Sequence, residues 1–439
     1  MKKISIFCFI VLTAWAQEKP IKYWIYFTSK PQLSFAKTSS PSEYAQSLGI
    51  SERAVTRRAK MSTSIISEED FPISQEFITQ LQHHGIVIQH QLRWFNAVTA
   101  YLTSDQEKEI AALPFVKNIE TVRVFKRKEL PRLENPFPKN STAPVKQRYD
   151  YGPSLTQMQM MDAVAVHNIG ISGRGVLVGM LDSGFRWREH EALKNLNVIA
   201  EYDFIQKDTV TANEAGDSAN QDSHGTSTLS LVGGFKEGQL VSPAFNANFI
   251  LGKTEYVPTE TNVEEDNWAA AIEWMEQHGV DVVSSSLGYS EFDATDANGN
   301  PQHSYIYADM NGRTATTTKA AVIAARKGVV VVNAMGNEAQ ASWHFLTAPA
   351  DADSIISVGA VSSSGIYASF SSVGPTSDGR IKPDVAAQGV FNYCAVPGKI
   401  AYNATSRGTS FSTPMTAGVC AMLLSARPEL TPIQVRDAL

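Results

Sequence analysis

Hydrophobic and polar residues follow two different patterns along this chain of 439 residues, and the change of pattern divides it into two parts. The first part, residues 21–127, combines short apolar runs of strand type with segments of helical periodicity. The pattern predicts strands at 22–27, 87–90, 97–102 and 116–125, and helices at 42–60, 74–84 and 105–113. Together these elements make a small α+β unit.

The second part, residues 149–439, alternates buried-type apolar runs with longer helical segments. Strands are predicted at 176–181, 249–253, 280–284, 329–333 and 355–361, and helices at 157–167, 262–278, 316–327 and 412–426. This alternation is typical of an α/β fold, in which a mostly parallel sheet has helices on both faces. Side chains that carry chemistry are then expected at the carboxyl ends of the strands.

A polar segment, residues 128–148, joins the two parts and follows the basic run 126–128. It contains Pro131, Pro136, Pro138 and Pro144. Prolines at this density oppose regular structure, so the segment is predicted to be an exposed linker, where proteolysis concentrates.

Residues 1–16 have the composition of a secretory signal peptide. Two lysines precede a short apolar run, which ends at the cleavage sequence Ala14-Trp15-Ala16. The run is too short to span a bilayer, and no later segment is long and apolar enough. We therefore expect a secreted protein without a membrane segment.

Charge and cysteine content bear on possible partners and on disulfide bonding. The formal net charge is −6, which gives no reason to expect a nucleic acid partner. Cys8 lies in the predicted signal peptide, which leaves Cys394 and Cys420. Neither lies in a nucleophile context, so we interpret both as buried thiols, although an oxidising compartment permits a disulfide between them.

Three short motifs in the second part supply a carboxylate, an imidazole and a hydroxyl. Asp182 ends a predicted buried strand in L-D-S-G, His224 opens a predicted helix in H-G-T, and Ser410 opens another in G-T-S-F-S-T-P. A serine hydroxyl becomes a strong nucleophile only when a neighbouring base takes its proton. Histidine suits that role near neutral pH, and a carboxylate holds the imidazole in the correct tautomer.

A fourth motif, G-N-E, follows the strand predicted at 329–333. There the Asn337 amide can donate a hydrogen bond to a developing oxyanion, beside the backbone N–H of Ser410. Each motif alone is more simply explained as a turn or a helix cap. Their joint occurrence in one α/β domain is the observation that favours catalysis.

At these four motifs the chain resembles the subtilisin-like serine peptidases, or subtilases. The resemblance covers residues 149–439 and implies that Asp182 orients, His224 is the base and then the acid, Ser410 attacks and Asn337 stabilises the oxyanion. It implies a secreted serine endopeptidase acting on proteins or peptides through an acyl-enzyme. Catalytic domains of this family normally continue beyond the point that corresponds to Leu439, so we expect the domain to be incomplete there.

The same resemblance suggests which residues bind the substrate. The segment Ser284, Ser285, Ser286, Leu287 and Gly288 is similar to the family's edge segment, to which an extended peptide adds as a strand. Ala334, Met335 and Gly336 are similar to one wall of the pocket for the residue before the cut. That wall carries no charge, so we expect an uncharged side chain in the pocket.

The resemblance also implies a role for residues 21–127, which are similar in size and pattern to an inhibitor-like propeptide. The chain would then be a zymogen inhibited by its own propeptide, with autocatalytic release within 126–148. A cut by another peptidase at the basic run 126–128 is the competing interpretation.

No metal is required by this chemistry, and none of the motifs is a metal site. Subtilases often bind structural calcium, and the oxygen-rich stretch 293–300 is the candidate, but its spacing does not fit an EF-hand loop and a solvated turn is favoured. Two other functions compete with the endopeptidase. One is a catalytically inactive subtilase that serves as a peptide-binding scaffold; the other is an esterase, which the absence of G-x-S-x-G at Ser410 disfavours.

Overall fold

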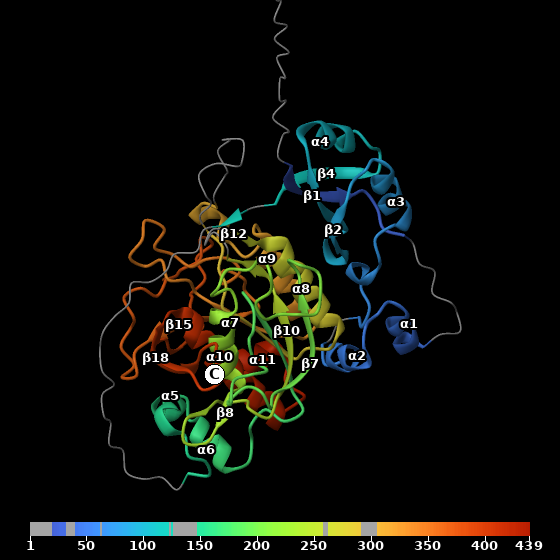
Figure 1. Cartoon of the computed structure of the whole chain (residues 1–439). Coiled ribbons are helices and arrows are strands. Elements are labelled where there is room, and N and C mark those ends of the chain that lie inside the picture. Colours follow the sequence, from blue (N-terminus) through green and yellow to red (C-terminus); the bar gives the residue numbers. More distant parts are fainter. Residues whose placement is uncertain are drawn as a thin grey trace, which may run out of the picture.

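The structure is a computed structural model, which describes residues 20–31, 40–61, 64–122, 124–125, 147–257, 262–290 and 305–439. The predicted signal peptide, most of the predicted linker and the stretch 293–300 lie outside the described residues. Two units are visible, an N-terminal unit of residues 20–125 and a C-terminal unit of residues 147–439 (Figure 1). In the part of the chain that the structure describes, no helix is both long and apolar enough to cross a membrane.

The N-terminal unit is built on an antiparallel sheet with the strand order β2-β3-β1-β4. Its strands are β1 (Ile21–Phe27), β2 (Ile88–Leu92), β3 (Ala97–Leu102) and β4 (Val116–Thr121). Helices α3 (Gln75–His83) and α4 (Ser104–Ala111) pack on one face, where Ile25, Ile78 and Leu81 belong to the unit's own hydrophobic core. The predicted α+β arrangement is therefore present.

A long excursion between β1 and α3 carries two short helices, α1 (Pro41–Ser47) and α2 (Glu52–Arg58), and the turn η1 (Glu68–Asp70). The sequence predicted one helix over 42–60, which is wrong. Gly49 has a φ of +77°, which no α-helix contains, and the Ser51 hydroxyl accepts the Ala54 N–H and so caps a new helix.

The C-terminal unit contains a seven-stranded parallel sheet with the order β16-β15-β14-β13-β6-β10-β7, which confirms the predicted α/β fold. Its strands are β6 (Leu177–Asp182), β7 (Asn197–Asp203), β10 (Asn248–Lys253), β13 (Val282–Ser285), β14 (Val330–Ala334), β15 (Ile356–Val361) and β16 (Val385–Gln388).

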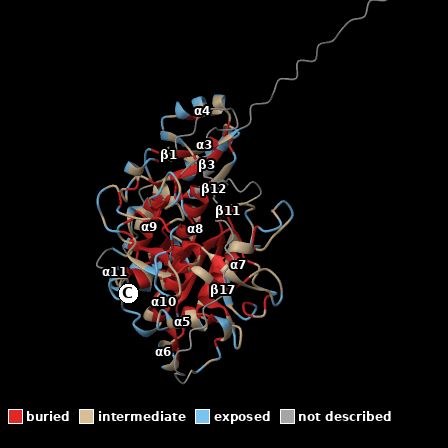
Figure 2. Cartoon of the chain, turned by 90° about the vertical axis from the view of Figure 1, so that its left-hand side faces the viewer, coloured by how far each residue is buried: buried red, intermediate tan, exposed pale blue. Residues whose placement is uncertain are grey.

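Helices cover both faces of this sheet. On one face lie α8 (Glu265–Gln277) and α9 (Thr316–Arg326), and on the other lie α7 (Ser223–Gly233) and α10 (Thr409–Ala426), with α11 (Pro432–Asp437) beside α10. Neighbouring residues of β13 point to opposite faces of the sheet: Val283 packs in the core under α8, and Val282 packs in the core under α10. Figure 2 shows the centre of the sheet and helices α8 and α10 largely buried, whereas α4 and α11 carry exposed residues.

Smaller elements complete the fold and correct the predicted pattern. The helix predicted at 157–167 is two helices, α5 (Leu155–Gln159) and α6 (Ala163–Asn168), because Asp162 between them has a left-handed φ of 55°. The remaining strands form pairs or small sheets outside the main sheet. They are β5 (Val124–Phe125), β8 (Phe235–Lys236), β9 (Leu240–Val241), β11 (Glu255–Tyr256), β12 (Asn262–Glu264), β17 (Val390–Ala395) and β18 (Tyr402–Arg407).

Candidate active site

Asp182 is the last residue of β6, at the carboxyl edge of the parallel sheet, and it is fully buried. Its Oδ1 accepts the backbone N–H of Ser183 at 2.8 Å. The chain then turns through Gly184, whose φ of 139° lies outside the range that other residues adopt readily. The Ser183 N–H therefore fixes one oxygen of this carboxylate at the end of the strand.

His224 is the second residue of α7, and its Nδ1 lies 2.7 Å from Oδ1 of Asp182. The neighbouring Gly225 makes this contact possible. A Cβ on Gly225 would lie 2.2 Å from the carbonyl oxygen of Gly184 and 3.0 Å from Cβ of Asp182, so only glycine lets the helix approach the strand end so closely. The structure thus brings the two predicted residues into direct contact.

Thr228 lies one turn after His224 on α7, and sequence reasoning did not identify it. Its hydroxyl lies 3.0 Å from Oδ2 of Asp182 and 3.1 Å from the Gly225 carbonyl. Donation to the carboxylate is the stronger of the two because it is charge-assisted. A threonine four residues after a helical histidine lies on the same face, and that spacing is the sequence signal that could have found it.

Ser410 is the second residue of α10. Its hydroxyl donates to the carbonyl of Ser286 at 3.3 Å, a long and weak bond for a hydroxyl donor. The ring of the next residue, Phe411, packs edge-on against His224 with centroids 5.8 Å apart. The first turns of α7 and α10 therefore lie side by side, with the imidazole and the hydroxyl at their starts.

Asn337 follows β14 and is held by the first turn of α10. Its Oδ1 accepts the backbone N–H of Thr409 at 2.9 Å and lies 3.2 Å from the Thr409 hydroxyl. These contacts engage the amide oxygen and leave the amide nitrogen as the donor. The N–H of Ser410 belongs to the same first turn, where backbone donors have no partner within the helix.

The structure corrects the predicted substrate segment in part. Ser284 and Ser285 lie in β13, which pairs with β6 on one side and with β14 on the other, so no substrate strand can add beside them. The Ser285 hydroxyl also accepts the indole N–H of Trp268 in the core. Ser286, Leu287 and Gly288 lie beyond the end of β13 and stay candidates.

The predicted pocket wall is mostly buried. Ala334 ends β14, and the Met335 side chain is fully buried in a cluster with Leu346 and Ala350. Gly336 has a φ of +101°, and a Cβ there would lie 2.9 Å from the Ser372 hydroxyl. Met335 therefore supports this segment from the core side, while Gly336 fixes the turn into Asn337.

Among the described residues, one group of carboxylates could hold a metal ion. Ligand oxygens of Asp203, Asp208 and Glu214 lie within 4.8 Å of one another. The ammonium of Lys253 already lies 2.7 Å from Asp203 and 2.7 Å from Asp217. Burial and the neighbouring carboxylates raise the pKa of Glu214. The Lys253 ammonium thus offsets the charge of Asp203, one of the three carboxylates of this cluster.

The comparison with known proteins identifies the family of the chain. Residues 173–439 match the family model described as Subtilase family. The chain belongs to the subtilase family. Residues 22–136 of this subtilase match a second model, described as Peptidase S8 propeptide domain, Bacteroidota. The N-terminal unit is therefore a propeptide, as the resemblance implied, and is called so from here on.

Several subtilisins are similar to this subtilase. Subtilisin NAT from Bacillus subtilis subsp. natto is 29% identical over 366 residues, which cover 82% of this chain and 78% of that protein. Subtilisin DY from Bacillus licheniformis is 32% identical over 287 residues, which cover 64% of this chain and 88% of the relative. A solved structure described as a cold adapted subtilisin-like serine proteinase covers 61% of this chain and 82% of its own, at 24% identity and a TM-score of 0.46.

Family membership and the subtilisin relatives make this subtilase a serine endopeptidase that carries a propeptide. The described part of the propeptide ends at the carboxyl side of the main sheet. Its strand β5 pairs antiparallel with β12, Phe125 opposite Val263 and Val124 opposite Glu264, and β11 completes a three-stranded sheet (Figure 1). Residues 262–264 were predicted as the start of a helix, which is wrong, because α8 begins only at Glu265.

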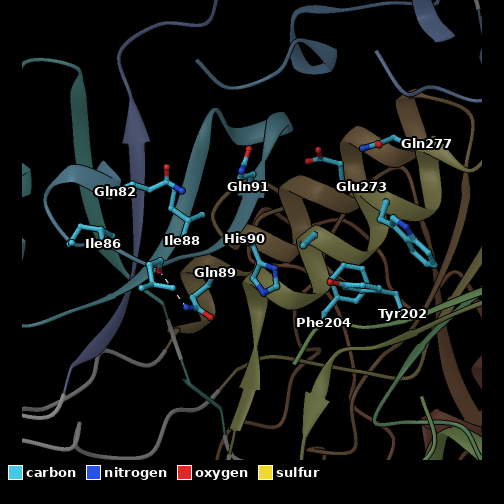
Figure 3. Close-up of a pocket in the computed structure, with 14 residues that line it drawn as sticks. Gln82, Ile86, Ile88, Gln89, His90, Gln91, Tyr202, Phe204, Glu273 and Gln277 are labelled. Atoms are coloured by element: carbon cyan, nitrogen blue, oxygen red, sulfur yellow. Dashed lines mark hydrogen bonds between the residues drawn. The ribbon is translucent and has the colours of Figure 1, made fainter. Parts of the chain in front are cut away.

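The propeptide sheet also covers α8. The Glu273 carboxylate accepts the backbone N–H groups of Arg93 and Trp94, each at 3.2 Å. Nearer the start of α8, Lys22 pairs with Asp266 at 2.8 Å. Between β2 and α8 a cavity of about 850 Å³ remains, lined by both units (Figure 3). This cavity belongs to the propeptide interface, and no residue of the candidate triad lines it.

Proposed function

We propose that Asp182, His224 and Ser410, with Asn337, cut peptide bonds through an acyl-enzyme, and that the chain is a secreted zymogen that first cuts its own linker. The contact that carries this proposal is the 2.7 Å approach of His224 Nδ1 to the buried Asp182. It fixes Nδ1 as the protonated nitrogen, so Nε2 keeps the lone pair that a general base needs.

The reaction follows from that tautomer. As the Ser410 hydroxyl turns from the Ser286 carbonyl and attacks the substrate carbonyl carbon, its proton passes to Nε2 of His224. The Oγ–C bond forms, and the carbonyl electron pair moves onto the oxygen, which the Asn337 amide and the Ser410 N–H stabilise. When the C–N bond breaks, the same proton goes to the leaving amine. Water then releases the acyl group by the reverse sequence of proton transfers.

The pairing of β5 with β12 supports both substrate binding and self-processing. Because β12 already accepts an extended strand of the propeptide, a substrate can add to the same edge once the propeptide has gone. The chain that follows Phe125 is the predicted linker, so the cut is proposed within residues 126–148. The uncharged pocket wall at 334–336 favours an uncharged side chain before the cut.

Secretion is proposed from the sequence of residues 1–16, which fits a signal peptide. Structural calcium stays a family expectation for which no residues are assigned, and the chemistry above requires no cofactor. Protein substrates and the propeptide are the proposed partners, and a nucleic acid or membrane partner is not proposed.

The test is expression without residues 1–16, as wild type and as Ser410→Ala. The wild-type chain should lose its N-terminal part and hydrolyse casein, and N-terminal sequencing of the mature protein should place the cut within 126–148. Ser410→Ala should stay intact. Ser412→Ala is the matched control, because Ser412 lies on the same helix and donates only to the Thr409 carbonyl at 2.9 Å. Processing of Ser410→Ala on its own would contradict the proposal and favour the scaffold or an external peptidase.

A further inference from the structure

Helix α2 of the propeptide lies against the catalytic domain (Figure 1). It presents three arginines, Arg53, Arg57 and Arg58, to the amino edge of the main sheet and to the C-terminal ends of α8 and α9. The triad lies at the opposite edge, at the carboxyl end of β6. A strand of six residues separates these edges by about 20 Å.

Arg57 is fully buried and binds two helix ends of the catalytic domain. Its Nε donates to the Lys327 carbonyl at 3.1 Å, after the end of α9, and Nη1 donates to the Val280 carbonyl at 2.5 Å, after the end of α8. Its Nη2 pairs with the Glu276 carboxylate. Nη1 and Nη2 also lie 3.4 and 3.3 Å from the Glu276 carbonyl, one of the last carbonyls of α8. The last carbonyls of a helix have no partner within it and carry partial negative charge, so the five N–H donors of a guanidinium fit here.

Arg53 and Arg58 extend the same contact on either side. Arg53 donates to the Gly279 carbonyl at 2.9 Å and the Gly175 carbonyl at 2.8 Å, and it pairs with the Asp281 carboxylate. Arg58 donates from Nε to Glu276 at 2.8 Å. Both oxygens of the buried Glu276 are therefore held by propeptide arginines.

The catalytic domain shapes this place by itself. Asp281 is fixed because its carboxylate also accepts the Leu177 N–H at 2.9 Å. Gly279 and Gly328 end α8 and α9 in the left-handed conformation, with φ of +86° and +92°. A Cβ on Gly279 would lie 2.6 Å from Cβ of Arg53, so the glycine leaves the space that α2 fills. Carbonyls, carboxylates and space are thus all set by the catalytic domain.

We propose that the catalytic domain carries a guanidinium-binding site, built around Glu276, Asp281 and the ends of α8 and α9, that retains the propeptide after the linker is cut. Its ligand is an arginine-bearing helix. The inference depends on one part of the proposed function, namely that the linker is cut. Strand β5 and helix α2 belong to one folded unit, so while one of them stays bound the other remains at high effective concentration near its own site. Cutting the linker therefore does not by itself free the enzyme.

The test uses the full chain after the predicted signal, with Ser410→Ala and a recognition sequence for a site-specific protease placed within 128–148. After cleavage by that protease, size-exclusion chromatography and surface plasmon resonance give the rate at which the N-terminal piece leaves. Truncating one partner of a buried charged pair lowers the binding free energy by about 2–5 kcal/mol, mostly through faster dissociation. The N-terminal piece that carries Arg57→Ala should therefore dissociate at least about thirtyfold faster. The matched control is Thr56→Ala, an exposed position on the same helix, which should leave at the parent rate.

Arg53→Ala is a second variant that should fold normally, because the Arg53 side chain is 38% exposed. Its N-terminal piece should dissociate several-fold faster than that of the parent chain. Asp281→Asn removes the charge of the Arg53–Asp281 pair from the catalytic domain and keeps an acceptor for the Leu177 N–H. It should also speed dissociation. If Arg57→Ala does not fold, these two variants decide. Parental dissociation rates in Arg53→Ala and Asp281→Asn would overturn the proposal. The chain carries Ser410→Ala and is cut by an added protease, so the result does not depend on whether the proposed triad is correct.

Discussion

The Thr228 hydroxyl donates to Oδ2 of Asp182 at 3.0 Å, while His224 binds Oδ1 of the same carboxylate. Both oxygens of Asp182 are therefore fixed from one face of α7. A hydrogen bond to a charged group contributes about 1.5–3 kcal/mol. Thr228→Val should lower kcat/KM by roughly tenfold to a hundredfold, because the carboxylate loses a donor and its fixed orientation.

Thr228→Ser is the control for this prediction, since it keeps the hydroxyl, and it should retain most of the activity. The measurement is kcat/KM on a peptide substrate for the mature enzymes, together with their thermal midpoints. Equal activity of the valine and serine variants would show that the Thr228 bond does not position Asp182.

Asn337→Ala should lower kcat by about a hundredfold to a thousandfold with little change in KM, a magnitude taken from the corresponding donor in subtilisin. The amide is held by Thr409, and its nitrogen is proposed to meet charge that develops only in the transition state. Steady-state kinetics of the mature variant give both constants. A rise in KM with unchanged kcat would mean that Asn337 binds the ground state and not the oxyanion.

His90 makes the docked propeptide sensitive to acid. Burial lowers the pKa of His90 to about 4, against the opposing effect of Asp266, and Lys22 and Lys207 lower it further. Its Nε2 lies 2.8 Å from Oδ1 of Asn267, and its ring lies beside Phe204 (Figure 3). A separated propeptide with an ordinary pKa near 6.5 takes up the proton first, so docking weakens as the pH falls from about 6.5 to about 4.

The size of this effect is about 1.4 kcal/mol, or tenfold, per pH unit in that window. The test compares the dissociation rate at pH 5.5 with the rate at pH 7.5 in the protease-cut Ser410→Ala chain. The ratio of these two rates should be roughly tenfold larger in the chain with His90 than in the same chain with His90→Gln. Glutamine can donate to the same Asn267 oxygen but does not titrate. An identical pH dependence for the two chains would rule out His90 as the group responsible.

Cys394 and Cys420 are free, fully buried thiols in the folded chain. Burial raises the pKa of Cys394 to about 11 and that of Cys420 to about 12. Because the thiolate is the reactive form, neither should react with a water-soluble disulfide reagent at pH 8 until the protein is unfolded. Two thiols should then titrate without added reductant, and a count of zero would reveal a disulfide.

Local pattern predicted much of the fold, because each predicted strand of the central sheet is a mainly apolar run that is buried at nearly every position. Boundaries failed where a single backbone conformation intervened, as at Gly49 and Asp162, since periodicity does not report a left-handed φ. Strand β12 was also missed, because a three-residue segment before a helix has no pattern of its own and is extended here by pairing with β5.

The four proposed catalytic residues, Asp182, His224, Ser410 and Asn337, could be named from sequence because they stand in short motifs with characteristic neighbours. Their surroundings could be known only from the folded chain. Thr228 on the second carboxylate oxygen, Ser284 and Ser285 enclosed between two strands, and Arg57 on the ends of two helices are all contacts between segments distant in the chain. Such contacts depend on how elements pack in three dimensions, and no local periodicity encodes that packing.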